Sequence, residues 1–94
     1  MILTIVPTPA SMASAARRAD ERAAEAVGFG VAARVLWAAY ADQLQPSVSA
    51  WAVSKIDHVA ERAADAAITE ATAIRTALAS PELAAGSAVE VALD

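Results

Sequence analysis

The sequence predicts a mainly α-helical protein: an antiparallel helical hairpin with a short β-strand at each end (β-α-α-β), completed by a second copy as a four-helix-type dimer. Three observations predict this fold: two long segments with apolar residues at helical spacing, a single proline between them, and two ends rich in β-branched residues. Residues 1–94 form one helical-hairpin domain. Because 28 of the 94 residues are alanine, the core is thin, and a lone hairpin is expected to be only marginally stable.

The first strand is expected at residues 1–6, which are mostly β-branched and apolar. Pro7 and Pro9 then prevent a regular ladder from continuing. Thr8 or Ser11 is suited to cap a helix, so the first helix is expected to begin within the four residues that follow Thr8.

The first helix has one uncharged apolar seam. Gly30 lies in this seam, although glycine costs about 1 kcal/mol relative to alanine inside a helix. We therefore expect the partner helix to approach very closely at Gly30. The seam repeats about every 3.5 residues and consists of Met12, Ala16, Ala19, Ala23, Ala26, Gly30, Ala33, Trp37, Tyr40 and Leu44.

The second helix follows a turn at Pro46. Proline disfavours helical backbone at the preceding Gln45, so the first helix is expected to end near Leu44 or Gln45. Ser47 or Ser49 is then expected to cap the second helix. Its apolar positions are Val48, Ala52, Ile56, Val59, Ala63, Ala67, Ala71, Ile74 and Leu78.

The last part of the chain predicts a short turn and a strand. The second helix should end by Ala79, because Ser80–Glu82 supplies a new cap, a proline and an acid, and Gly86 closes that turn. Residues 88–93 alternate in the way of a half-buried strand. Because the helices are antiparallel, both strands finish at one end of the hairpin. We expect them to pair and to form the edge through which the protein assembles or docks.

Charged residues indicate the register of the two helices. If the turn centres near residue 46, residues whose numbers sum to about 92 lie opposite one another. Arg22 then faces Glu70, and Arg34 lies near Asp57 and Glu61. Each such pair contributes little alone, but together they favour this register over its neighbours.

The most distinctive stretch runs from Phe29 to Trp51, because it holds every aromatic residue of the chain. One interpretation is an aromatic core at the hairpin tip, and the other is an exposed binding hot spot. Both hold if a second chain completes the core. The candidate partner-binding residues, at this tip and on the strands, are Trp51, Tyr40, Trp37, Phe29, Ile2, Thr4, Val89 and Val91.

Composition excludes several kinds of chemistry. A net charge of −4 argues against a sequence-independent grip on nucleic acid. The chain has no cysteine, and His58 is its one histidine, with no motif of metal ligands around it. Asp57, Glu61 and Asp65 form an acidic stripe that is typical of a solvated face. We therefore expect no enzyme activity, no cofactor and no metal.

A membrane location is not expected either. Residues 27–41 are the most apolar window, but Arg34 interrupts them and they are shorter than the roughly 18–20 residues of a spanning helix. The first residues carry no positive charge ahead of their apolar run, unlike a signal peptide. The expected location is the cytoplasm, or the host cytoplasm if the chain is phage-encoded.

These features favour a non-enzymatic protein–protein interaction or assembly module, which binds itself and another protein. Alanine and arginine usage is typical of a high-GC genome, such as that of an actinobacterium or its phage. A virion or scaffold component and a membrane-active small protein are alternatives.

The two long alanine-rich helices with Trp51 near the turn resemble the outline of the WXG100 and PE classes of actinobacterial type VII secretion substrates. That resemblance implies a helical-hairpin dimer and a secreted substrate. Trp51-Ala52-Val53 stands where the WXG100 pattern has Trp-x-Gly, and the C-terminal Tyr-x-x-x-Asp/Glu signal does not occur.

Overall fold

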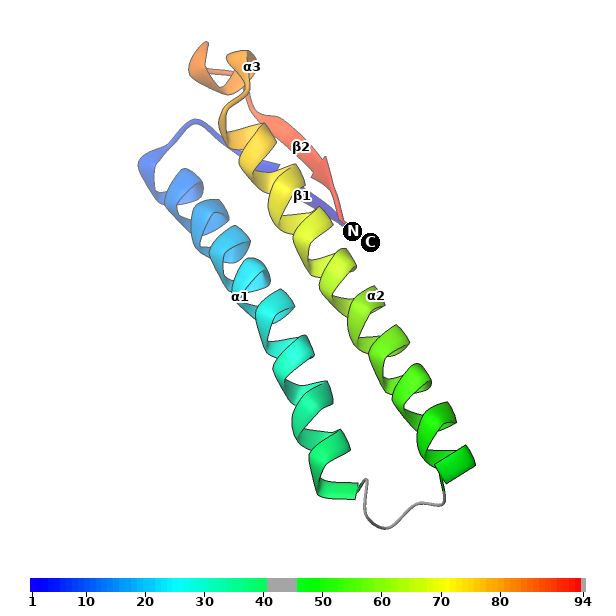
Figure 1. Ribbon diagram of the computed structural model, residues 1–94. Coiled ribbons are helices and arrows are strands. Elements are labelled where there is room, and N and C mark those ends of the chain that lie inside the picture. Colours follow the sequence, from blue (N-terminus) through cyan, green and yellow to red (C-terminus); the bar gives the residue numbers. More distant parts are fainter. Residues whose placement is uncertain (41–45, 94) are drawn as a thin grey trace.

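A computed structural model describes residues 1–40 and 46–93. Two long antiparallel helices, α1 (Pro9–Tyr40) and α2 (Pro46–Leu78), form its body. A short helix α3 (Pro81–Ala84) follows α2, and the strands β1 (Ile2–Ile5) and β2 (Val89–Ala92) pair with each other. The start of β1 and the end of β2 lie together beside the helix pair, and the end of α1 and the start of α2 lie at the far end of the rod (Figure 1). The predicted helical hairpin with terminal strands is thus confirmed, with α3 as an added short helix.

Two hydroxyl side chains accept hydrogen bonds at the start of α1. Thr8 caps the helix, since its Oγ1 accepts a hydrogen bond from the Ser11 amide at 3.2 Å. The Ser11 hydroxyl oxygen accepts in turn from the Val6 amide at 3.1 Å, which ties the helix to the segment leaving β1. Of the two predicted caps, Thr8 therefore caps the helix, whereas the Ser11 side chain binds the backbone of the segment that follows β1.

The start of α2 corrects the predicted boundary. Helix α2 begins at Pro46 itself, so Ser47 and Ser49 are helical residues and not its cap. Proline suits the first helical position, because the backbone N–H that it lacks would have no partner inside the helix and because its φ is already helical. The predicted end of the first helix at Leu44 or Gln45 lies outside the described residues.

The predicted turn after α2 is confirmed. Ser80 caps α3, and its hydroxyl accepts from the Leu83 amide at 3.4 Å, with Pro81 and Glu82 in the first turn. Gly86 follows with a φ of +93°, a conformation that a residue with a side chain rarely adopts.

The ribbon of β1 and β2 is antiparallel and has one inner and one outer face. Leu3 pairs with Val91 and Ile5 with Val89, and these side chains point towards the helices. The exposed outer face carries the alternate pairs, Ile2 with Ala92 and Thr4 with Glu90. The predicted alternation of the last strand is therefore confirmed.

Within the described residues, the buried core lies at the end of the hairpin that carries the ribbon. Ile5 and Ile74 are the largest fully buried side chains among those that the structure describes. The ribbon and α3 supply a third surface there, whereas farther along the rod the two helices bury mainly alanine against each other. The residues of this core are Ile5, Ala15, Ala19, Ala71, Ile74, Ala77, Leu83, Val91 and Leu93.

The helix seams are largely as predicted, with three corrections, the first of which is Met12, which is exposed near the start of α1. Ala19, Ala26 and Ala33 on α1 are buried, but an added Cβ at Gly30 would meet no atom within 4 Å, so no close approach occurs there. On α2, Val59 is 66% exposed while its neighbour Ala60 is half-buried. Straight helices drift about 20° per heptad from an ideal 3.5-residue repeat, which moves single positions out of the interface.

Candidate functional site

The predicted binding residues on the ribbon divide between its two faces. Ile2 is 62% exposed, and Thr4 is exposed beside it on the outer face. Val89 is half-buried, and Val91, only 6% exposed, belongs to the core of the chain itself. Ile2 and Thr4 are therefore the two ribbon candidates that a partner can reach without unfolding.

Both long edges of the ribbon expose backbone groups. The Leu93 amide donates to the Met1 carbonyl at 2.8 Å, and antiparallel pairs alternate between bonded and non-bonded positions. The backbone groups of Ile2 and Thr4 on one strand, and of Glu90 and Ala92 on the other, consequently point away from the partner strand. Within the described residues the sheet has two strands, so these edges could accept a further strand.

The aromatic candidates are placed only in part. Phe29 and Trp37 are half-buried on α1, so each combines contact within the hairpin with solvent exposure. The side chains of Tyr40 and Trp51 lie outside the described part of the chain. The choice between an aromatic core and a hot spot therefore stays a prediction.

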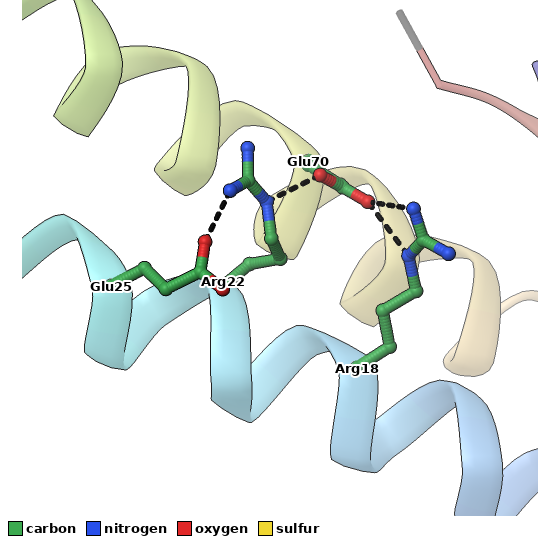
Figure 2. A network of polar contacts seen from close by, with 4 residues as sticks. All are labelled: Arg18, Arg22, Glu25 and Glu70. Atoms are coloured by element: carbon green, nitrogen blue, oxygen red, sulfur yellow. Dashed lines mark hydrogen bonds and ion pairs between the residues drawn. The ribbon is translucent and has the colours of Figure 1, made fainter.

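A network of four charged side chains joins the helices (Figure 2). Glu70 on α2 accepts hydrogen bonds from Arg18 at 2.7 Å and from Arg22 at 2.5 Å, one to each carboxylate oxygen. Arg22 also binds Glu25 one turn along α1. The predicted opposition of Arg22 and Glu70 is confirmed, and with it the register. Asp20 and Arg75 form a more exposed pair at 3.0 Å.

The contacts within this network shift the pKa values of Glu70 and Arg22. Burial alone would raise the pKa of Glu70, but the hydrogen bonds and charges of Arg18 and Arg22 outweigh burial, so this pKa lies below its ordinary value. Hydrogen bonds to Glu25 and then Glu70 raise the pKa of the Arg22 guanidinium. Both carboxylate oxygens of Glu70 accept from arginines, so the network links α1 to α2.

A shallow hollow of about 310 Å³ lies between the helices at Gly30. Arg34 lines it together with Asp57 and Glu61, as the register predicted, and the remaining lining residues are alanines. The hollow forms because glycine and alanine leave space that no larger side chain fills.

The outward side of α1 carries apolar residues that lie in the apolar window 27–41 but not in the predicted seam. Val27, Val31 and Val35 are 72%, 54% and 62% exposed. Their spacing of four residues was readable from the sequence, but the predicted seam accounted for only one side of the helix. They are the largest group of exposed valines in the described residues.

The described residues offer little for ligand chemistry. No group of three or more His, Asp or Glu side chains in them could hold a metal ion. No buried side-chain nitrogen or oxygen among them lacks a hydrogen-bond partner. None of the helices in this part of the chain combines the length and apolarity needed to cross a membrane.

These features define a class of architecture: a two-helix hairpin closed at one end by a two-stranded ribbon. Comparison of the chain with protein-family models, curated proteins and solved structures found no match.

Proposed function

We propose that this protein is a non-enzymatic interaction and assembly module, which works by associating with a second copy of itself and through that assembly with another protein. The observation that carries the proposal is the amount of surface that a single chain leaves uncovered. The chain exposes 6363 Å², whereas a compact monomer of its mass would expose about 5,100 Å².

The shape supports the same conclusion. The radius of gyration is 18.3 Å, in a rod of 60 × 18 × 17 Å. A compact domain of this length would have a radius of about 12 Å. The surplus of about 1,300 Å² exceeds the roughly 800 Å² that each partner buries in a standard interface. Association therefore brings the exposed surface of each chain close to that of an ordinary globular protein.

The test is the mass of the full chain in solution, measured by light scattering behind a sizing column from about 1 to 100 μM. We expect a mass that is a small multiple of 9.6 kDa, together with a melting temperature that rises with protein concentration. A compact monomer with a concentration-independent melting temperature would contradict self-association. Much larger particles would instead favour a virion or scaffold component.

A further inference from the structure

The outward side of α1 bears a continuous apolar face, which we call the outer stripe: Ala24, Val27, Val31, Val35 and Ala38. All five residues are exposed. At about 100° per residue, Val31 lies roughly 140–160° around the helix from the buried Ala26 and Ala33. The stripe therefore faces away from α2.

The outer stripe contains no charge. Gly28, Ala32 and Ala39 flank it and are also exposed. Glu25 turns aside to bind Arg22, and Arg34 lines the hollow between the helices. The uncharged surface is thus a face of the helix about four turns long.

The corresponding face of α2 is different. It carries exposed charged and polar residues over the same length of the rod, namely Lys55, His58, Arg62 and Asp65. A helix that is apolar on two opposite sides is buried on both of them in a stable protein, whereas one with a single apolar side lies at the surface. By this criterion α1 is an inner helix of an assembly and α2 an outer helix.

The order of residues in the outer stripe indicates which molecule binds there. Its members are separated by three, four, four and three residues, and the sequence Ala, Val, Val, Val, Ala reads the same in both directions about Val31. We propose that a second copy of this chain docks on the outer stripe, α1 against α1 and antiparallel, with a two-fold axis at Val31. Val27 then meets Val35 of the partner subunit, and Ala24 meets Ala38 of the partner subunit. Such self-complementarity is what a two-fold interface requires.

The size of the residues suits this packing. The stripe spans about 21 Å at 1.5 Å per residue, and its alanines, with Gly28 beside them, let two helix axes approach to the short end of the usual 8–10 Å range. The surface surplus of about 1,300 Å² per chain is sufficient for an interface of standard size. The result is a four-helix assembly with both α1 helices inside.

A lipid surface fits the stripe less well than a second copy does. Helices that lie on membranes present Trp, Phe or Leu on one face and Lys or Arg on the other. The stripe holds only valine and alanine, and the net charge of −4 opposes attraction to anionic lipid. Vesicle binding is nevertheless an outcome that the test distinguishes.

The first experiment compares Val31→Asp with Val59→Asp in the full chain. Val59 is a similarly exposed valine, but it lies on α2 and outside the stripe. We expect Val31→Asp to weaken self-association at least 100-fold in Kd by sedimentation, because two aspartates would meet at the axis, and Val59→Asp to leave it unchanged. Circular dichroism checks that both variants remain helical.

The second experiment tests the antiparallel axis and does not depend on the aspartate variant folding. The chain contains no cysteine, so single cysteines can be introduced cleanly. We expect Val31→Cys to form an intermolecular disulfide on mild oxidation and Val59→Cys not to do so. Val27→Cys and Val35→Cys should each cross-link poorly alone and efficiently when mixed.

The outcomes separate this inference, which rests on the proposed function, from that function itself. If the wild-type chain associates but Val31→Asp associates equally well, the stripe is not the interface, while the proposed function stands. If the wild-type chain is monomeric at 100 μM, both fail. If a monomeric chain floats with neutral or anionic vesicles and Val31→Asp does not, the stripe is a membrane-binding face and our assignment is overturned.

Discussion

At the scale of single residues, Glu70 links α2 to two arginines of α1. Its carboxylate receives Arg18 on one oxygen and Arg22 on the other, and it is only 14% exposed. The two arginines are one helical turn apart on α1, so a shift of α2 by one turn would exchange or lose these partners. An exposed pair such as Asp20 with Arg75 contributes less, because water screens it.

We predict that Glu70→Gln lowers the free energy of unfolding by about 1 kcal/mol at pH 7, since charge-assisted bonds to partly exposed arginines are weakened by solvent. The pKa of Glu70 is lowered on folding, so the folded chain binds fewer protons than the unfolded chain in acid. The stabilisation is therefore complete above the ordinary carboxyl pKa of 4.5 and is lost as the pH falls through the folded pKa.

Urea unfolding of wild type and Glu70→Gln from pH 3 to 7 measures this difference. The two curves should converge in acid, where the protonated carboxyl resembles the amide. Glu25→Gln is the matched control, because Glu25 also accepts from Arg22 but is 51% exposed. If the difference between wild type and Glu70→Gln is constant across this pH range, the carboxylate charge has no role.

At the scale of elements, glycine marks two different situations in this fold. Gly30 is helical with free space around its Cα, whereas Gly86 adopts a φ of +93° after α3. Gly30 lowers the stability of the helix, and no neighbouring atom requires glycine there. Gly86 is required by the turn that leads into β2.

We predict that Gly30→Ala raises the free energy of unfolding by about 0.5–1 kcal/mol, the helix propensity difference, and that Gly86→Ala lowers it by about 1–2 kcal/mol. Both substitutions add one methyl group, so thermal unfolding of the pair separates backbone preference from the effect of added bulk. A loss of stability in Gly30→Ala would mean that the helices pack more tightly at this position than the free space around Gly30 implies.

The ribbon offers a second test at this scale. The Thr4 amide points outwards, while the Leu3 amide faces β2, so proline should be tolerated at position 4 and not at position 3. We expect Thr4→Pro to keep the ribbon and to block only strand addition by a partner, and Leu3→Pro to lower the free energy of unfolding by about 1–3 kcal/mol through the loss of one ladder hydrogen bond. Amide hydrogen exchange of residues 89–92 reports ribbon integrity. Equal loss of protection in both variants would contradict the assigned edge.

At the scale of the whole molecule, stability is concentrated where three surfaces meet. The ribbon and α3 cover the terminal half of the hairpin, and the branched side chains Ile5, Ile74 and Leu83 are buried there. Farther along the rod, the buried side chains of α1 are the alanines Ala26 and Ala33, and valines on the outward side of α1 face solvent. Among the described residues, the largest buried side chains thus lie beside the ribbon.

We predict that Ile74→Ala costs about 2–5 kcal/mol, the range for a fully buried isoleucine, and more than Trp37→Ala, although tryptophan is the larger side chain. Trp37 is only half-buried, so its removal leaves less apolar surface unfilled. Denaturant unfolding by circular dichroism, on the Val31→Asp background that removes self-association, measures both. If Trp37→Ala lowers the free energy of unfolding more than Ile74→Ala does, the aromatic tip contributes more to the core than the end beside the ribbon.

The sequence by itself determined which segments form helices and strands, where α3 starts, that the termini pair, and that Arg22 faces Glu70. These features depend on short-range chemistry: proline restricts the backbone, hydroxyls cap helices, and strand residues alternate. Only the tertiary structure decided that the described core beside the ribbon includes Val91, that Val59 is exposed, that the space at Gly30 is unfilled, and that α1 keeps a second apolar side. The reason is that burial depends on which surfaces meet in space, and a pattern of valine and alanine along one helix does not state which neighbour covers it.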